Sequence, residues 1–324
     1  MGILGRMVVT VLPLMPKFVV GWVSRRYHAG VNLESALETM TSLSKEGACF
    51  TVDVLGEEIT TMQEAQFFIE EYNRVLDRIV AEGFDANLSI KPTAFGLLID
   101  PHSAEKSMEN ILRKAEKNNI FVRLDMEDHR VTQTTIDLVL RLHEMGLKNV
   151  GTVLQGRLFR TLDDISDLAN QLGQDADHRI CKGIYLESSD IAHTDKKSIT
   201  LATNEAIDAM LQSGAYTAIA SHDSKVIEHS LRSLKNMGMG PDIEDPRPNA
   251  GNSRIGKGPG YEFQMLLGVR GDIRRKLAKD GHRTRIYLPY GSKWYEYGVR
   301  RLRENPDVAW HITKALLMPW SNRR

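Results

Sequence analysis

Two adjacent arginines near the end of the chain have the residue type and the spacing to bind a small anion. Four polar residues recur there at positions i, i+3, i+4 and i+7 and so share one face of a predicted helix: Tyr297, Arg300, Arg301 and Glu304. The helix is expected to begin after Ser292 and to end at Asn305-Pro306. An arginine presents a planar fork of donors that matches a carboxylate or a phosphate. A solvent-exposed face with i,i+4 ion pairs explains the same spacing, so other parts of the chain must decide between the two.

Other charged and polar residues follow or interrupt short β-rich runs elsewhere in the chain. They are Asp53, Lys91, Asp125, Gln155, Arg179, Lys182, Tyr185, His222, Glu262, Gln264 and Tyr287. Each of them alone has a structural explanation, such as a helix cap or a buried imidazole with its hydrogen bonds satisfied. These explanations do not account for so many polar residues at one edge of a folded domain, because burying unpaired charge costs free energy. A mixed group of acids and bases therefore indicates a functional site.

The elements that must position these residues form a regular alternation of strands and helices. The β-rich runs are residues 49–55, 87–92, 120–125, 149–155, 179–185, 217–221, 262–266 and 286–288. Helical spacing follows them at residues 61–82, 103–117, 132–145, 162–172, 196–212, 225–237, 273–279 and in the segment with the two arginines. Eight such units predict an α/β fold, a (βα)8 barrel of the TIM type, whose function lies at the carboxyl ends of the strands. An open doubly wound sheet is the alternative, but it would need fewer strands and a switch point.

The composition excludes several classes of protein. The chain has 324 residues, with 42 Lys and Arg against 42 Asp and Glu, so no charge bias points to nucleic acid. Cys49 and Cys181 are its only cysteines, which argues against a disulfide scaffold or a cysteine-based zinc site and favours a reducing compartment.

The first 48 residues are expected to form helices that pack on a barrel made of residues 49–324. Residues 7–22 are mostly apolar but are interrupted by two prolines and a lysine. They fall short of the roughly 20 apolar residues that a membrane span needs, and no small-x-small cleavage site follows them. A helix packed on the domain is favoured, and an interfacial segment that lies on a membrane surface is the alternative.

Motifs for several other chemistries are missing from the sequence. It contains no His-x-His, His-Glu-x-x-His or Gly-x-Ser-x-Gly motif, and no dinucleotide fingerprint opens a helix after the first strand. We expect no metal site, although the cluster of Asp125, Glu127, Asp128 and His129 could bind a hard cation as a minor alternative. Residues 238–260, which contain a Gly-Lys-Gly-Pro-Gly run, are expected to form a mobile surface loop.

Several of these segments together resemble the proline dehydrogenase family. The resemblance rests on Lys91, on Arg-Leu-Asp-Met-Glu-Asp from Arg123, on Arg-Ile-Cys-Lys-Gly-Ile-Tyr from Arg179, and on Tyr-Glu-Phe-Gln-Met-Leu-Leu-Gly from Tyr261. It extends to Arg-Ile-Tyr-Leu-Pro-Tyr-Gly from Arg285 and to Tyr-Gly-Val-Arg-Arg-Leu-Arg-Glu-Asn, which carries the two arginines. It covers most of the chain from about Thr51 onward, and the chain resembles the short, single-function bacterial form.

This resemblance implies a fold, a cofactor and a reaction. The fold is a distorted (βα)8 barrel whose last helix lies over the barrel mouth. The reaction is the oxidation of L-proline to Δ1-pyrroline-5-carboxylate, the first step of proline catabolism to glutamate, by hydride transfer to a non-covalent FAD. The electrons pass to a membrane quinone, and the product is a substrate for a pyrroline-5-carboxylate dehydrogenase. The resemblance implies a cytoplasmic protein, with peripheral contact at the inner membrane face as the alternative.

The resemblance also implies individual roles for the polar residues. Arg300 and Arg301 clamp the proline carboxylate with Lys91 as a third cation, and Glu304 holds the clamp in position. The residues around the proline ring are Asp125, Leu266, Tyr287 and Tyr297. Arg179 lies beside the reactive flavin nitrogen, and the other flavin-binding positions are Gln155, Lys182, Tyr185 and His222. The chain departs from the usual family residues at Ile180, Cys181, Ile184 and Asp223, which affects local flavin contacts more than the reaction.

Two other functions are compatible with a barrel of this kind. A flavin reductase of the methylenetetrahydrofolate type would not need two helical arginines and a lysine around a carboxylate. A barrel that has lost catalysis and only binds a ligand would remain colourless when FAD is added.

Overall fold

Eight parallel strands form a closed barrel in which each strand pairs with its neighbours in the sequence and β1 pairs with β8. The computed structural model describes Gly21, residues 24–248 and residues 260–304, with side chains as far as Val299. The strands are β1 (Cys49–Val54), β2 (Ala86–Ile90), β3 (Val122–Leu124), β4 (Val150–Gln155), β5 (Asp177–Cys181), β6 (Tyr216–Ala220), β7 (Tyr261–Leu266) and β8 (Thr284–Tyr290). The predicted (βα)8 barrel is confirmed, and the open doubly wound alternative is wrong.

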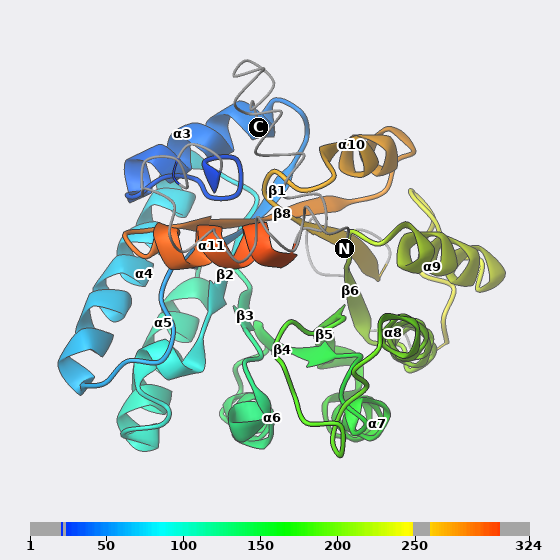
Figure 1. Ribbon diagram of the computed structural model, residues 1–324, viewed down its shortest axis with the longest axis horizontal. Coiled ribbons are helices and arrows are strands. Elements are labelled where there is room, and N and C mark those ends of the chain that lie inside the picture. The colour runs from blue at the N-terminus through cyan, green and yellow to red at the C-terminus, as the bar shows by residue number, and fades with distance from the viewer. Residues whose placement is uncertain (1–20, 22–23, 249–259, 305–324) are drawn as a thin grey trace.

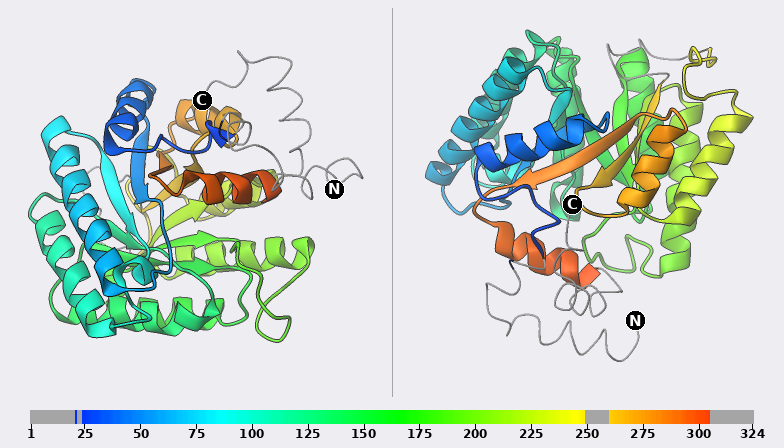
Figure 2. Two further views of the ribbon diagram at one scale, coloured as in Figure 1. Left: turned by 60° about the vertical axis from the view of Figure 1, so that its left-hand side comes forward. Right: turned by 90° about the horizontal axis from the view of Figure 1, so that it is seen from above.

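Helices surround the barrel and connect consecutive strands (Figure 1). They are α4 (Met62–Glu82), α5 (Pro101–Glu116), α6 (His129–Glu144), α7 (Thr161–Leu172), α8 (Lys196–Gln212), α9 (Ser224–Asn236) and α10 (Gly271–Lys279). Short 3-10 turns, η2 (Pro92–Phe95) and η3 (Gly173–Asp175), lie after β2 and α7. The helix α3 (Leu33–Ser44) precedes the barrel, and α11 (Trp294–Glu304) follows it. Figure 2 shows α11 at one end of the barrel, directly after the carboxyl end of β8.

Local sequence signals explain where many of these helices begin and end. Thr61 and Glu64 form a capping box at the start of α4, and Gly83 ends that helix in the left-handed conformation, with φ of 68°. Asp side chains accept backbone hydrogen bonds at the starts of α5, α6, α8 and α9. The predicted helix boundaries accordingly agree closely with the structure.

The hydrophobic core lies outside the strands, between the barrel wall and the helices. One cluster takes side chains from α3, from the elements between β1 and β4, and from β8. A second cluster takes its side chains from α6, α7, α8, α9 and α10 and from β4 to β7. Because each strand buries one face against helices, its other face is free to carry polar groups inside the barrel.

One predicted strand and part of one predicted loop differ from the expectation. The fifth run was predicted to continue to Tyr185, but β5 ends at Cys181, because Gly183 has a φ of 88° that extended backbone does not allow. Within the predicted loop, Arg247 is buried, pairs with Asp245 at 2.6 Å and donates to the carbonyl of Leu211 at 2.8 Å, so this part is anchored. Residues 249–259 lie outside the described residues.

The apolar N-terminal stretch, residues 7–22, lies outside the described residues apart from Gly21. Among the residues that the structure describes, no helix is both long and apolar enough to cross a membrane. The helix α3, which lies within the 48 residues that were predicted to form helices, buries Leu33, Leu37 and Met40 in the first hydrophobic cluster.

Candidate functional site

The interior of the barrel is polar along several strands. On β7, Phe263 and Met265 belong to the outer hydrophobic cluster, whereas Glu262 and Gln264 form hydrogen bonds with each other and with residues of other strands. On β8, Tyr287 likewise bonds across the barrel. This alternation has the two-residue period of a strand, with apolar residues outward and polar residues inward.

Asp125, which directly follows β3, connects three strands at the carboxyl end of the barrel. Its Oδ1 accepts from Ser89 Oγ and from Arg179 Nη1, both at 2.6 Å, and its Oδ2 accepts from the Tyr287 hydroxyl at 2.7 Å. Burial opposes ionisation of this carboxyl, but the charges of Arg179 and Lys91 outweigh it and lower the pKa of Asp125. The site therefore holds a fixed negative charge at neutral pH.

Lys91 forms a buried ion pair with Asp53. The Nζ–Oδ1 distance is 2.5 Å, and the two side chains are 9% and 1% exposed. Burial opposes the charge of Lys91, but the carboxylates of Asp53, Asp125 and Glu57 outweigh it and raise the pKa of the lysine. Burial also raises the pKa of Asp53, to about 6. The predicted third cation of the site is therefore charged and is held in place by a carboxylate that the sequence did not assign to it.

Arg179 is fixed by two neighbours from different strands. Its Nη1 pairs with Asp125 at 2.6 Å, and its Nε donates to Gln264 Oε1 at 2.6 Å. The guanidinium carbon lies 5.3 Å from the centre of the Tyr287 ring. The remaining nitrogen, Nη2, is buried and has no hydrogen-bond partner among the described residues. A buried donor without an acceptor costs about 1–3 kcal/mol, so this nitrogen is suited to an acceptor on a ligand.

The other residues predicted to bind a cofactor make separate contacts. Gln155 Nε2 donates to the carbonyl of Glu127 at 2.8 Å, and the Tyr185 hydroxyl donates to Glu57 Oε2 at 3.1 Å. Lys182 Nζ pairs with Asp223 Oδ2 at 2.5 Å. These residues lie at or beyond the carboxyl ends of β4 and β5 but do not join the hydrogen bonds around Asp125.

His222 and Leu266 form a hydrogen bond with each other. The backbone N–H of Leu266 donates to His222 Nε2 at 2.9 Å. Because this ring nitrogen is an acceptor, a neutral His222 carries its proton on Nδ1. The structure therefore brings together one predicted cofactor-binding residue and one predicted substrate-contacting residue.

The helix α11 contains the predicted arginine clamp. Tyr297 is 6% exposed, and the backbone of Arg300, Arg301 and Glu304 lies within the helix, but the side chains of these three residues are outside the described part of the chain. The orientation of the polar face therefore stays a prediction.

One side of α11 packs against the segment before α3. A Cβ added at Gly298 would lie 2.7 Å from the Cβ of Ser24, and Trp294 stacks on His28 with 5.7 Å between ring centres. Glycine within a helix is less favourable than alanine, so close packing explains its presence at position 298.

Glu127, which the sequence suggested only as one member of a minor cation site, is also buried near the site. Its carboxylate accepts from Thr93 Oγ1 at 2.5 Å and from the backbone N–H of Thr93 at 3.1 Å. Burial raises the pKa of Glu127 to about 7. The sequence placed it beside Asp125, but no signal in a single sequence shows which of the two carboxyls forms an ion pair in the described structure.

The minor alternative of a cation site has no ligand group in the described part of the chain. No group of three or more His, Cys, Asp or Glu side chains there could hold a metal ion. Asp128 instead pairs with Arg130 at 2.7 Å and caps α6, and His129 Nδ1 lies 2.6 Å from Glu187 Oε2.

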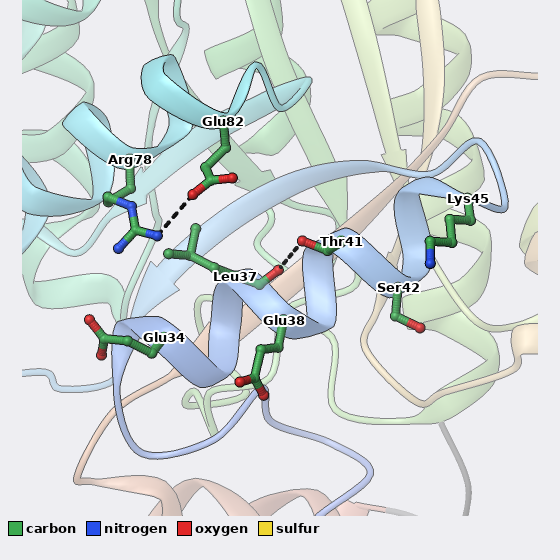
Figure 3. A pocket seen from close by; sticks show the side chains of 8 residues that line it. All are labelled: Glu34, Leu37, Glu38, Thr41, Ser42, Lys45, Arg78 and Glu82. Carbon is green, nitrogen blue, oxygen red and sulfur yellow. Dashed lines mark hydrogen bonds and ion pairs between the residues drawn. The ribbon is translucent and has the colours of Figure 1, made fainter.

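A surface groove of about 460 Å³ lies between α3 and α4, on the outside of the barrel (Figure 3). It is lined by Glu34, Leu37, Glu38, Thr41, Ser42, Lys45, Arg78 and Glu82. Its charges include a pair between Arg78 and Glu82 at 2.9 Å. None of the predicted site residues lines this groove, so the candidate site is the rim around Asp125 and not this hollow.

Comparison with known proteins decides the family. A family model described as proline dehydrogenase matches residues 36–313. The chain belongs to the proline dehydrogenase family.

The sequence similarity to curated relatives extends over nearly their whole length. The chain is 33% identical over 297 residues to proline dehydrogenase 1 of Bacillus subtilis (strain 168), covering 91% of this chain and 90% of that protein. It is 32% identical over 301 residues to proline dehydrogenase of Deinococcus radiodurans, again covering 91% and 90%.

Solved structures support the same fold. Proline utilization A from Bdellovibrio bacteriovorus, inactivated by N-propargylglycine, matches with a TM-score of 0.77 and 21% identity. Proline utilization A from Bradyrhizobium japonicum, in a D779W mutant, matches with a TM-score of 0.70 and 18% identity. The match to the Bdellovibrio protein covers 93% of this chain but only 34% of that longer chain. The barrel of this proline dehydrogenase family member thus has the fold of one part of a longer protein.

Proposed function

We propose that this protein oxidises L-proline to Δ1-pyrroline-5-carboxylate with a non-covalently bound FAD. The observation that carries the proposal is the cluster of Asp125, Arg179, Lys91 and Tyr287 at the carboxyl end of the barrel, in a chain that belongs to the proline dehydrogenase family. Fixed charges of both signs at this end of a (βα)8 barrel are typical of a catalytic site.

The residues present fit a flavin. The buried Nη2 of Arg179 has no acceptor among the described residues, and the cationic Arg179 suits a ring that gains negative charge on reduction. We propose that Arg179, Gln155, Lys182, Tyr185 and His222 hold the cofactor. Bound FAD would supply the acceptor for the hydride that leaves the carbon next to the proline nitrogen.

The protein would contribute orientation and charge to this reaction. Arg300, Arg301 and Lys91 bind the substrate carboxylate in the proposal, and Glu304 positions the two arginines. A small zwitterion must be held by its charge if one C–H bond is to face the acceptor. Lys91 supports this role because its charge is fixed by the 2.5 Å contact with Asp53.

The remaining side chains would surround the proline ring. Tyr287 and Tyr297 offer flat apolar surfaces with polar tips, and Leu266 adds an apolar contact. Asp125 keeps the Tyr287 hydroxyl in place through the 2.7 Å hydrogen bond. The substrate amine loses its proton during oxidation, and the imine product hydrolyses in water to glutamate semialdehyde.

Electron transfer and assembly complete the proposal. The electrons pass on to a quinone, and a pyrroline-5-carboxylate dehydrogenase consumes the product. We further propose that residues 1–48 form a helical unit that packs on a barrel of residues 49–324. Contact with a membrane surface through residues 7–22 is tested by sedimentation with lipid vesicles before and after removal of the residues before Val23.

The colour of the purified protein tests the cofactor and the substrate together. We expect a yellow protein whose flavin absorbance is bleached by L-proline without oxygen. A protein that remains colourless with added FAD refutes the proposal, as does a flavin that proline does not reduce.

Kinetics of Arg301→Ala test the clamp. We expect a higher KM for proline while FAD stays bound, because the variant loses a cation for the substrate carboxylate. The matched control is Arg275→Ala, which removes an exposed arginine from α10. Equal KM values in the two variants would remove Arg301 from the clamp.

A further inference from the structure

A continuous chain of hydrogen bonds leads from Arg179 into the barrel interior. Arg179 Nε donates to Gln264 Oε1 at 2.6 Å, and Gln264 Nε2 donates to Glu262 Oε1 at 2.6 Å. The same carboxylate oxygen accepts from Arg285 Nε at 2.8 Å, and Arg285 Nη1 donates to the carbonyl of Phe50 at 2.7 Å. The side chains of Glu262 and Arg285 are 0% exposed, so water does not compete for these bonds.

The neighbours of Gln264 determine which way its amide points. An arginine only donates hydrogen bonds, so the amide atom that faces Arg179 must be the oxygen. The amide nitrogen must then face Glu262, whose carboxylate accepts it. A carboxylate at position 262 and an arginine at position 179 thus select the same amide orientation from opposite sides.

This amide is one of two anchors that fix the plane of the Arg179 guanidinium. Gln264 on β7 holds Nε, and Asp125 after β3 holds Nη1. A guanidinium is planar, so two anchored nitrogens also determine the direction of the third. The third nitrogen, Nη2, is the one without a partner among the described residues.

The order of charged and neutral groups along this chain of hydrogen bonds has a second consequence. A neutral amide at position 264 separates the cation of Arg179 from the anion of Glu262, and the charge of Glu262 is matched by Arg285. Among the described side chains, Arg179 therefore pairs with one carboxylate, that of Asp125, at 2.6 Å. With a carboxylate at position 264, Arg179 would lie between two anions and would present less positive charge to a ligand.

We propose that Glu262 and Gln264 are positioning residues that direct Arg179 toward the bound flavin and preserve its positive charge. The inference rests on the proposed function, because it concerns the same FAD site. Glu262 and Gln264 act through Arg179: Gln264 fixes the orientation of its guanidinium, and Glu262 fixes the amide of Gln264.

An exchange of the two side chains separates charge from connectivity. The double variant Glu262→Gln/Gln264→Glu keeps the composition and the number of hydrogen bonds, with the bond between positions 262 and 264 reversed in direction, but it moves the carboxylate next to Arg179. We expect the variant to bind FAD and to have a more negative flavin reduction potential than wild type, measured by anaerobic dye-coupled titration. The potential should shift because the additional anion reduces the stabilisation of the reduced ring.

The matched control is Tyr216→Phe. The Tyr216 hydroxyl donates to the other oxygen of Glu262 at 3.2 Å and makes no hydrogen bond to Gln264 or Arg179 in the described structure. We expect this variant to keep the wild-type potential. An exchange variant whose potential equals that of wild type and Tyr216→Phe overturns the proposal.

A second variant decides the question if the exchange variant does not fold. Gln264→Met has nearly the same length but no amide, so Arg179 Nε loses its acceptor and the guanidinium keeps only its anchor at Asp125. We expect the affinity for FAD to fall at least severalfold, measured by titration of the apoprotein, and unchanged affinity overturns the proposal. Wild-type protein that binds FAD and is bleached by proline shows that any such failure belongs to this inference. Wild type that does neither refutes the proposed function itself.

Discussion

Removing one partner of the ion pair between Arg123 and Asp177 tests how the barrel interior tolerates an unpaired charge. The Arg123 Nη2–Asp177 Oδ1 distance is 2.5 Å, and each side chain is 2% exposed. Arg123 Nη1 also donates to the carbonyls of Asp177 at 2.5 Å and Thr152 at 3.0 Å. The substitution Arg123→Met fills a similar volume but leaves the carboxylate of Asp177 buried without this cation.

The expected loss follows from the burial of the pair. Breaking a buried pair by removing one partner costs about 3–5 kcal/mol, whereas an exposed i,i+4 pair contributes only about 0.3–0.5 kcal/mol. We therefore expect Arg123→Met to lower the free energy of unfolding by about 3–5 kcal/mol. Replacing both partners, in Arg123→Met/Asp177→Leu, should restore much of this loss, because no charge is then left unpaired.

Urea denaturation of Arg123→Met, Asp177→Leu and the double variant measures these free energies, with circular dichroism and tryptophan fluorescence required to report the same transition. The control is Arg78→Met, which breaks the pair between Arg78 and Glu82, whose side chains are 41% and 42% exposed. Equal losses in Arg123→Met and Arg78→Met would refute the reasoning. So would a double variant that loses the sum of its two single variants.

Three further predictions concern the site and its surroundings. The side chains of the ion pair between Lys182 and Asp223 are 30% and 32% exposed, so the pair contributes about 1 kcal/mol at most. Asp223→Asn should release Lys182 to contact FAD and tighten FAD binding up to about fivefold, measured by fluorescence titration. Weaker or unchanged binding would contradict this. Burial raises the pKa of Glu127 from 4.5 to about 7, so the neutral acid stabilises the fold and this contribution is lost as the pH rises toward and through 7. Between pH 5 and 8 the free energy of unfolding of wild type should therefore fall by about 2–3 kcal/mol more than that of Glu127→Gln. Equal falls in the two proteins would argue against the raised pKa of Glu127. Finally, Gly298→Ala should displace α11, because the added Cβ would lie 2.7 Å from Ser24, and raise the KM for proline roughly threefold to tenfold. Adding Ser24→Gly should reverse this increase, and a double variant with the KM of Gly298→Ala would show that the contact is irrelevant.

The sequence predicts the barrel well because its signals are local. The alternation of β-rich runs with amphipathic helices, and glycines such as Gly83 after a helix, occur within short windows of the chain. The end of β5 was missed because Gly183 has a positive φ that the apolar run did not reveal.

The candidate site is less predictable, because its partners are far apart in the sequence. Lys91 and Asp53 are separated by 38 residues, and the sequence supplied Lys91 as a free cation. The resemblance to the family supplied the residues, whereas the bonds of Asp125, Gln264 and Glu262 depend on which strands become neighbours when the barrel closes. Burial, which raises the pKa of Glu127, is likewise a property of the whole fold.

The division of the hydrophobic core into two clusters has a consequence for how the barrel opens. The first cluster joins α3 and the elements up to α6 with β8, and the second joins α6 to α10, while Leu172 packs against both. Across the barrel interior the two sides are connected by hydrogen bonds and ion pairs such as Arg179–Asp125. Amide hydrogen exchange should therefore show two cooperative units with separate opening free energies, divided near β4. The boundary between these two units passes through the candidate site. A ligand bound there should therefore slow amide exchange in both units.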